Sequence, residues 1–529
     1  MEGMASPSAL ETQVILDVRR SHFNPTASLK IRTAQIVRGI GTYMYDEAGN
    51  EYLDCINNVA HVGHCHPEVT NAICEQLRNI NTNSRFLHEG LANYTQELLA
   101  TMPPSLKMMW MVNSGSEAND LAVRIARAAR PGRSHFAVMS GAYHGHLESL
   151  IPLSPYKFWG PGGAGKAGNV HVIPTPDPYR GEHLDGRTAA RSAIAAADRA
   201  GGSLCALFIE SILSCGGQVV PPPGYLKDLF DEMHAHGVVC VADEVQSGVG
   251  RVGSAMWGFQ AQGADPDIVT IGKAVGNGYP VSVLVTTHAL ADRFCDGGME
   301  YFNTFGGSNA ACAAALATLR VVQSERRQAH AERVGTYLKE KLVQLQPQYP
   351  FLGDVRGLGL MLGIEVVSPN SVSMAPAPVL AGWVVSSMRS RRVLLSTDGP
   401  YDNVIKIKPP MVFGELEADR LLAELRAVLS EELTPDVMQR LAVQEAEHAC
   451  TVVEPLRLKI TSNAADMADA LAWAEHHSRP AKRPQTPAPS GWVSPQESFW
   501  VETAAAAAQE PQLMAAGSVS RTPQPISRL

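Results

Sequence analysis

Short apolar runs alternate with helical patterns from about residue 105 to residue 290, and this alternation constrains the fold more than any other feature. The runs are AVM after His135, CALFI before Glu210, VVCVA before Asp243, DIVTI before Gly272 and VSVLV after Pro280. The clearest helical pattern opens near Ser116 and ends at Pro131 and Gly132. Strands that alternate with helices form parallel sheets covered by helices. The sequence therefore predicts an α/β protein with a parallel or mostly parallel sheet.

The segments on both sides of this region indicate a second, smaller domain. Residues 36–54 have the turns and apolar runs of short strands, and residues from about 309 to 450 combine helices with glycine-rich strands. We predict a smaller α+β domain built from residues 1–74 and 309–450, and a large domain over residues 75–308. Residues 451–529 are an extension, in which the Pro, Ser, Thr, Gln and Ala content predicts a disordered tail from about residue 476.

Composition narrows the class of protein. With 45% apolar and 18% charged residues the 529-residue chain is globular, and its net charge of −8 with dispersed basic residues disfavours nucleic acid. The nine cysteines are scattered and lack Cys-x-x-Cys spacing, which argues against disulfides and structural zinc. No run of about 18 apolar residues predicts a membrane span, and no secretory signal is visible. We expect a soluble intracellular protein, in the mitochondrial matrix or the cytoplasm.

Four short segments carry the residues that we expect to form a site. The first is NSGSEAND, residues 113–120, which puts Gly115 and Ser116 at the beginning of the predicted helix. A helix start offers unpaired N–H groups to a phosphate, and glycine permits a close approach to the backbone. An ordinary serine cap with Glu117 in the first turn explains the same residues. The second segment, AYHGH, puts Tyr143 after a strand, where it is either packed or offers its face to a planar ring.

The other two segments end strands of the predicted sheet. VVCVADEVQ carries Asp243 beyond a buried strand, and DIVTIGKAVGNGYP carries Lys273 beyond the next one. Ligands of open α/β sheets bind outside the carboxyl ends of the strands, although a helix cap and a solvent-facing lysine are the ordinary explanations. Together the four segments supply a lysine for a Schiff base, an acid for a ring nitrogen, an aromatic face and a phosphate-binding helix start. Pyridoxal 5′-phosphate (PLP) needs all four.

On these segments the chain resembles the class III aminotransferases of PLP fold type I over roughly residues 20–450, which implies a large, mostly parallel, seven-stranded sheet. The resemblance implies that Lys273 forms the Schiff base and that Asp243 pairs with the pyridine nitrogen, so that these two are the catalytic residues. It implies further cofactor contacts by Gly115, Ser116, Tyr143, His144, Glu210, Gln246 and Thr304. In this family the threonine at position 304 reaches the cofactor phosphate of the neighbouring subunit. A homodimer, or a tetramer, is therefore implied.

Further segments resemble the branch of this family that eliminates phosphate instead of exchanging amino groups. They are NVAHVGHCHP, NTNSRFLHE, AYHGHLESLIPLSPYKF, FNTFGG and LLSTDGP. The resemblance implies a lyase for a small phosphorylated amine. ESILSCGGQ and GMEYFNT favour ethanolamine phosphate as that amine, with acetaldehyde, ammonia and phosphate as products. The alternatives are 5-phosphohydroxylysine as the substrate, and an ω-aminotransferase of the alanine–glyoxylate type.

Substrate contacts are indicated by residue type alone. A substrate phosphate needs cations, and the candidates are Arg85 and Lys157 in these segments and Lys406 shortly after LLSTDGP. We hypothesise that at least Arg85 contributes. Ser247 and Val249 depart from the residues common in this family, and this departure bears on substrate preference.

Two other patterns suggest different functions. GPGGAGKA, residues 160–167, approaches a nucleotide-binding P-loop, but Ala167 stands where magnesium needs a hydroxyl group. Metal-ligand residue types gather in a second segment, at His61, His64, Cys65 and His66. Alternate residues on a short stretch rarely face one ion, so we expect no metal site. A binding or regulatory protein of the same fold would not need Lys273 and Asp243 together.

Overall fold

The computed structural model describes residues 11–23, 34–369 and 374–449. The predicted extension and tail, residues 451–529, lie outside this part of the chain. Within it, no helix combines the length and the apolar character that a bilayer crossing requires.

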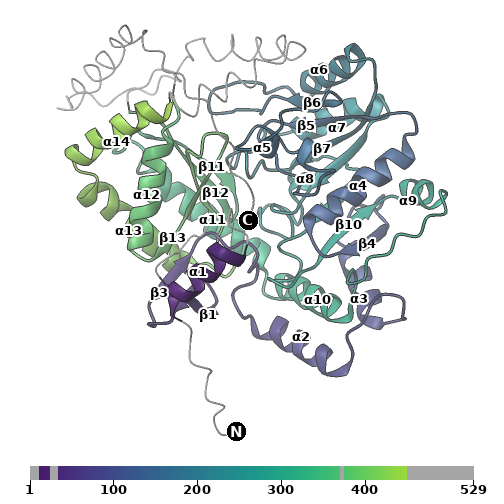
Figure 1. The fold of residues 1–529 in the computed structure, drawn as a ribbon, viewed down its shortest axis with the longest axis horizontal. Helices are drawn as coiled ribbons and strands as arrows, with labels where there is room; N and C mark the ends of the chain where they lie inside the picture. The colour runs from purple at the N-terminus through teal and green to yellow at the C-terminus, as the bar shows by residue number, and fades with distance from the viewer. Residues whose placement is uncertain (1–10, 24–33, 370–373, 450–529) are drawn as a thin grey trace, which may run out of the picture. The chain divides into compact units, whose positions relative to one another are not determined.

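A seven-stranded sheet forms the centre of the large predicted domain (Figure 1). Its strands, in spatial order, are β4 (Met108–Val112), β10 (Ser282–Thr286), β9 (Ile268–Ile271), β8 (Val239–Asp243), β7 (Leu204–Glu210), β5 (His135–Met139) and β6 (Val170–Ile173). The pairs from β9 to β6 are parallel, whereas β10 runs antiparallel to both β4 and β9. The mostly parallel sheet that the sequence predicts is confirmed.

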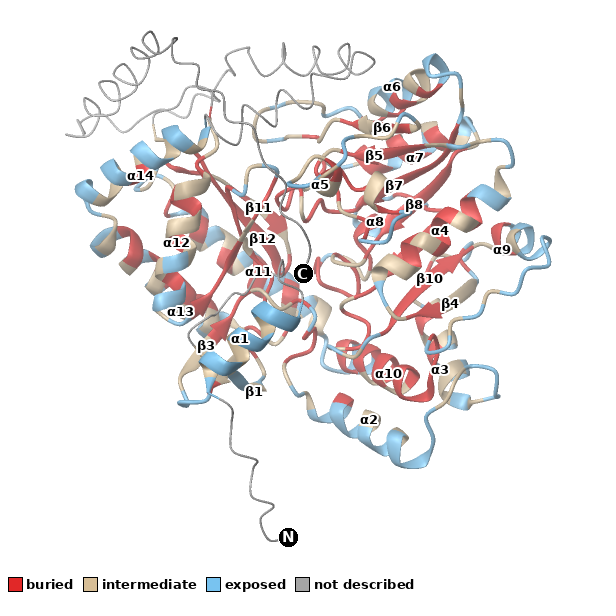
Figure 2. Cartoon of the chain, in the orientation of Figure 1, coloured by how far each residue is buried: buried red, intermediate tan, exposed pale blue. Residues whose placement is uncertain are grey.

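Two hydrophobic cores lie on the two faces of this sheet, because alternate residues of each strand point to opposite faces. Phe208 and Val241 pack into one core with Leu121 of α4, and Leu207 and Cys240 pack into the other with side chains of α7. Figure 2 shows these strands as buried. The helices around the sheet are α3 (Glu89–Leu99), α4 (Gly115–Ala129), α5 (Pro155–Phe158), α6 (Gly186–Arg199), α7 (Tyr225–Ala235), α8 (Gly258–Ala261) and α9 (His288–Cys295).

Both flanks of the chain build two smaller sheets. The first contains β1 (Ile36–Ile40), β2 (Tyr43–Asp46), β3 (Glu51–Asp54) and β13 (Val393–Leu394), and the second contains β11 (Leu352–Leu358), β12 (Met361–Val366), β15 (Val404–Ile407) and β14 (Ser396–Asp398). β13 pairs in parallel with β3, and Leu53 lies opposite Val393. Residues from both flanks of the chain therefore share one sheet.

The helices of the flanks are α1 (Thr12–His22), α2 (Pro67–Asn79), α10 (Asn309–Ser324), α11 (Arg327–Val343), α12 (Pro378–Ser390), α13 (Glu415–Ala427) and α14 (Pro435–His448). Leu53 packs in one core with Leu338, Val384 and Leu421, so the smaller α+β part built from both flanks is confirmed. The exact domain boundaries stay predictions. α10, which begins at a predicted boundary, packs into the core of the large sheet through Ala311 and neighbouring residues.

Candidate active site

The carboxyl ends of β7, β8 and β9 meet the start of α4 at one edge of the large sheet. Glu210 ends β7 and lies opposite Asp243, which ends β8 and lies opposite Thr270 of β9. Lys273 follows β9 by two residues, and α4 begins at Gly115 shortly after β4 ends. A cavity of about 360 Å³ opens at this edge. Eight residues predicted from the sequence line it, namely Gly115, Ser116, Tyr143, His144, Glu210, Asp243, Gln246 and Lys273.

The Asp243 carboxylate is held in one direction by three donors. Its Oδ2 accepts from Asn119 Nδ2 and His144 Nδ1, each at 2.9 Å, and its Oδ1 accepts from the Val245 N–H at 3.1 Å. Asn119 is fixed in turn, because its amide oxygen accepts from the Thr270 hydroxyl at 2.8 Å. A buried carboxylate with a fixed direction suits the recognition of an N–H group on a ligand.

The first turn of α4 faces the cavity. The Ser114 hydroxyl accepts from the Glu117 N–H at 3.2 Å, and the Glu117 carboxylate accepts from the Ser114 N–H at 3.1 Å. The serine that caps the helix is thus Ser114 and not Ser116. Gly115 and Ser116 are the first two helical residues, whose N–H groups have no partner within the helix. A Cβ atom at position 115 would lie 2.8 Å from Cγ2 of Val245, so glycine is required where α4 starts beside the end of β8.

Lys273 reaches the cavity from the loop that follows β9. Asn277 ties this loop to the N-terminal flank, because its Oδ1 accepts from the Val62 N–H and its Nδ2 donates to the Gly63 carbonyl, both at 2.9 Å. Among the described residues, no carboxylate forms an ion pair with Lys273. Its amine is therefore available to a ligand.

Tyr143 is positioned by Glu210. Glu210 Oε1 accepts from the Tyr143 N–H at 3.2 Å, and Oε2 accepts from the N–H and the hydroxyl of Ser214. Burial raises the pKa of Glu210, and the nearby Asp243 charge raises it further. The Tyr143 ring meets the edge of Tyr156, with centroids 6.0 Å apart and planes at 78°. This packing fixes the plane of a ring that lines the cavity, as stacking on a planar ligand requires.

Comparison with known proteins decides the family, since the family model for class III aminotransferases matches residues 26–429. The chain belongs to the class III aminotransferase family. It is 46% identical over 453 residues to a Drosophila melanogaster protein named alanine–glyoxylate aminotransferase 2-like, covering 83% of this chain and 90% of the relative. It is 39% identical over 407 residues to a Caenorhabditis elegans protein named ethanolamine-phosphate phospho-lyase homolog 1, covering 73% and 86%.

A solved structure gives a third match for this class III chain. A phospholyase from Arthrobacter in complex with phosphoethanolamine superposes with a TM-score of 0.73 at 35% identity, covering 79% of this chain and 99% of that chain.

PLP is the cofactor of class III enzymes, and the residues of the cavity fit it. The N–H groups at the start of α4 suit the phosphate of PLP, and the fixed Asp243 carboxylate suits its pyridine N–H. The Tyr143 ring suits the face of the cofactor ring, and the Lys273 amine suits its aldehyde. The chain is thus a PLP-dependent class III enzyme of fold type I. The role of each residue stays a proposal.

Gln246 joins the cavity to both flanks of the chain. Its Oε1 accepts from Lys408 Nζ at 2.9 Å and from Asn58 Nδ2 at 3.3 Å. Its Nε2 donates to the hydroxyl oxygen of Ser214. The contact with the cofactor's ring hydroxyl stays a prediction, but the structure puts Gln246 in the cavity wall, with a buried lysine behind it.

The predicted residues that do not line this cavity are Arg85, Lys157, Lys406 and Thr304. Thr304 is exposed in the loop between α9 and α10, where a residue that reaches a neighbouring subunit would have to be. Lys157 lies beside the cavity wall, with Nζ 5.7 Å from the centre of the Tyr143 ring. The substrate and subunit roles of these residues stay predictions.

Several residues in or behind the cavity wall were not predicted from the sequence, although the sequence pattern around two of them, Asn119 and Lys408, is unusual. Asn119 is a polar residue on the buried face of α4, among Ala118, Leu121 and other apolar side chains. Lys408 follows Lys406 by two residues, so both side chains leave the extended chain on the same side. A buried amide and a second lysine at that spacing are the features that would have identified them.

The P-loop-like and histidine-rich segments have structural explanations. Residues 160–167 follow α5 and precede β6, whereas a P-loop follows a strand and begins a helix. His61 contacts the Val249 carbonyl at 2.8 Å, and His64 contacts the Asp54 carboxylate at 2.7 Å. His66 contacts a carboxylate just after α10 at 3.2 Å. The three imidazole rings have separate partners and do not converge.

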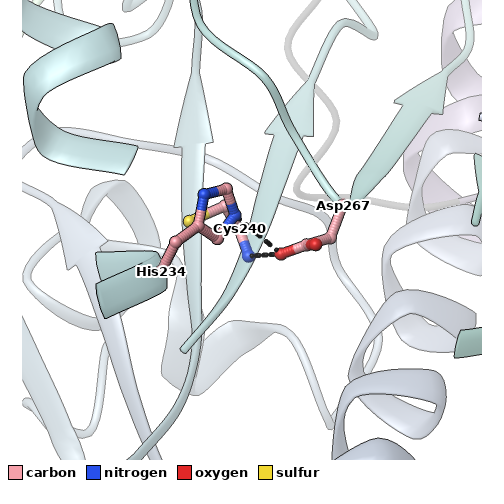
Figure 3. Close-up of side chains that lie close together, drawn as sticks. All are labelled: His234, Cys240 and Asp267. Atoms are coloured by element: carbon pink, nitrogen blue, oxygen red, sulfur yellow. Dashed lines mark hydrogen bonds and ion pairs between the residues drawn. The ribbon is translucent and has the colours of Figure 1, made fainter. Parts of the chain in front are cut away.

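A second group of ligand-type side chains lies away from the cavity, at His234, Cys240 and Asp267 (Figure 3), with candidate ligand atoms within 4.8 Å of one another. Asp267 Oδ2 accepts from His234 Nε2 at 3.0 Å and from the Cys240 backbone N–H at 2.8 Å. The hydrogen bond to Asp267 raises the pKa of His234, and burial raises the pKa of Cys240 well above its usual value. Asp267 already accepts hydrogen bonds from both neighbours, so this group is explained as a hydrogen-bonded cluster that joins α7 to the starts of β8 and β9.

Proposed function

We propose that this chain is a PLP-dependent phospho-lyase that converts ethanolamine phosphate to acetaldehyde, ammonia and phosphate. The observation that carries the proposal is the match to the Arthrobacter phospholyase in complex with phosphoethanolamine, which spans 99% of that chain at 35% identity. The 39% identity to the Caenorhabditis elegans phospho-lyase homolog supports the same activity.

The reaction needs a proton removed and a phosphate expelled from neighbouring carbons of the substrate. PLP, when bound, withdraws electrons from the carbon that bears the substrate nitrogen. We assign to Lys273 Nζ the removal of the proton from that carbon, because its amine is not committed to an ion pair within the described chain. The carbon–oxygen bond to phosphate then breaks, and water releases the remaining two-carbon unit as acetaldehyde and ammonia.

Asp243 and Tyr143 act by holding the ring. Because three donors fix Asp243, its carboxylate is aimed at one point, where it would keep the proton on the pyridine nitrogen. The Tyr143 N–H is tied to Glu210, which fixes the start of the loop that carries the ring. These residues would serve an aminotransferase equally well.

Two alternative functions have their own support. The lyase for 5-phosphohydroxylysine would use the same machinery on a larger amine. An aminotransferase is favoured by the name of the Drosophila relative, at 46% identity. The difference lies in whether a keto acid is needed as an amino-group acceptor.

The deciding experiment incubates the full-length, PLP-loaded protein with ethanolamine phosphate and no keto acid, and measures inorganic phosphate and acetaldehyde. We expect both products in equal amounts, and none from Lys273→Ala. Parallel reactions contain 5-phosphohydroxylysine alone, or alanine with glyoxylate. Phosphate from 5-phosphohydroxylysine alone would assign the other lyase activity, and a product formed only with glyoxylate would assign an aminotransferase.

The homodimer is part of the same proposal. Thr304 lies in an exposed loop with Phe305, whose side chain is 68% exposed, and the loop that follows Arg85 exposes Phe86 and Leu87. Exposed apolar side chains suit burial against a second copy of the chain. In such a dimer Thr304 would approach the cofactor phosphate of the neighbouring subunit.

A further inference from the structure

Lys408 is a lysine buried behind the cavity. Its side chain is 2% exposed, and its ammonium donates to Gln246 Oε1 at 2.9 Å. A buried ammonium loses hydration, so its position demands compensation by fixed acceptors. Lys408 has no part in the proposed reaction steps.

The charges around Lys408 leave it incompletely neutralised. Asp398 lies 3.9 Å away but is shared with Lys406, which is closer to it at 2.8 Å. Burial lowers the pKa of Lys408 to about 8, with Lys406 and Lys273 lowering it and Asp398 and Cys215 raising it. The ammonium form still predominates at neutral pH, facing Gln246.

The orientation of the Gln246 amide follows from its neighbours. An ammonium group can only donate, so Oε1 must face Lys408. The Ser214 hydroxyl donates its single proton to Glu210, so its oxygen must accept from Gln246 Nε2. Asn58 adds a second donor to Oε1 at 3.3 Å. Two independent contacts therefore point the N–H side of the amide away from Lys408.

We propose that Lys408 is a positioning residue that locks Gln246 so that its amide donates to the ring oxygen of PLP and favours the deprotonated form of that oxygen. The inference depends on the proposed contact between Gln246 and the ring hydroxyl, and it deepens the cofactor site rather than the choice of substrate. Without Lys408 only the Ser214 and Asn58 contacts hold the amide, so its carbonyl oxygen faces the ring oxygen more often, which favours a protonated ring oxygen instead.

The test is a pH titration of the visible absorption spectrum of the full-length, PLP-loaded protein. We expect Lys408→Met to raise the titration midpoint by about one pH unit, because the hydrogen bond that the correctly oriented Gln246 amide donates to the ring oxygen disfavours protonation of the chromophore. The matched control is Lys339→Met, since Lys339 donates to the Gly357 carbonyl at 3.2 Å and does not line the cavity. Its midpoint should equal that of the wild type.

A double-mutant cycle separates positioning from a direct charge effect. If Lys408 acts through Gln246, Lys408→Met should add no shift to that of Gln246→Ala. Fully additive shifts, or an unchanged midpoint in Lys408→Met, overturn the proposal. Lys408→Gln repeats the test with a polar side chain if the methionine variant does not fold. The readout does not involve phosphate release, so a protein that binds PLP but lacks lyase activity still tests Lys408.

Discussion

At the scale of single residues, three basic side chains are predicted substrate contacts, and their surroundings in the structure differ. Arg85 donates to Glu300 at 3.1 Å, with its guanidinium 3.9 Å from the centre of a phenylalanine ring. Lys406 is paired with Asp398 at 2.8 Å. Lys157 lies over aromatic rings at the cavity wall, and no carboxylate in the described ranges pairs with it. We therefore propose that Lys157 contributes most to binding of a substrate phosphate.

We expect Lys157→Ala to raise the KM for ethanolamine phosphate about 10- to 100-fold, because a hydrogen bond to a charged group contributes about 1.5–3 kcal/mol. The rate at saturating substrate should change less, since Lys273 and not Lys157 removes the proton in the proposed reaction. Arg85→Ala, measured in the same steady-state assay, tests whether Arg85 contributes. An unchanged KM in Lys157→Ala, or an equal increase in both variants, would contradict the ranking.

At the scale of secondary structure elements, α14 caps α12. Glu445 of α14 accepts from the N–H groups of Val379 and Leu380, at 3.0 and 3.2 Å, in the first turn of α12. The first N–H groups of a helix have no acceptor within the helix, so the Glu445 carboxyl group supplies the acceptor that is missing. Burial raises the pKa of Glu445 to about 7, although both hydrogen bonds oppose the increase. Burial outweighs the caps, so ionisation of Glu445 has a cost in the folded state.

The sign of the resulting pH dependence follows from linkage. Because the folded pKa of about 7 lies above the usual 4.5, the contribution of Glu445 to stability is full below the usual pKa and is lost as pH rises through the folded one. As pH increases from about 5 to about 8, we expect the urea concentration at the unfolding midpoint to fall more in the wild type than in Glu445→Gln. The glutamine side chain still accepts through its amide oxygen but cannot ionise. Parallel pH profiles of the two proteins would rule out this role.

At the scale of the whole molecule, the two flanks and the large sheet meet at the cavity. β3 and β13 join the flanks, and the Lys408 N–H donates to the Cys55 carbonyl at 2.8 Å. Asn58 and Lys408 then reach Gln246 from opposite ends of the chain. Loosening the flanks should therefore weaken the cofactor site as well as the fold.

Leu53 tests this coupling, because it is fully buried in the core that the flanks share. We expect Leu53→Ala to lower the free energy of unfolding by about 2–5 kcal/mol through the cavity that it leaves. The matched control is Leu416→Ala on α13, where the side chain is 82% exposed and the change should stay within about 0.5 kcal/mol. Chemical denaturation gives both values, and a PLP titration of Leu53→Ala should show weaker binding. Equal free energies of unfolding for the two variants would refute the role of Leu53 in the core that the flanks share.

The sequence by itself determined the mostly parallel sheet and the positions of Gly115, Asp243 and Lys273 at its edge, because these signals are local, whereas the cofactor contacts of His144, Glu210 and Gln246 were expected from the family resemblance. An apolar run followed by Asp243 or Lys273 indicates a strand end, and Gly115 lies at the start of a helix. The antiparallel direction of β10 left no such mark, since a buried apolar strand reads the same in both directions.

Only the tertiary structure decided which distant residues complete the cavity. Lys408 and Gln246 are 162 positions apart, and Asn58 and Gln246 are 188 apart. Periodicity and spacing describe neighbours within a few turns, whereas a hydrogen bond between such segments depends on how separate sheets pack. Lys157 and Lys406 looked alike in the sequence, because the ion pair between Lys406 and Asp398 exists only once the chain has folded.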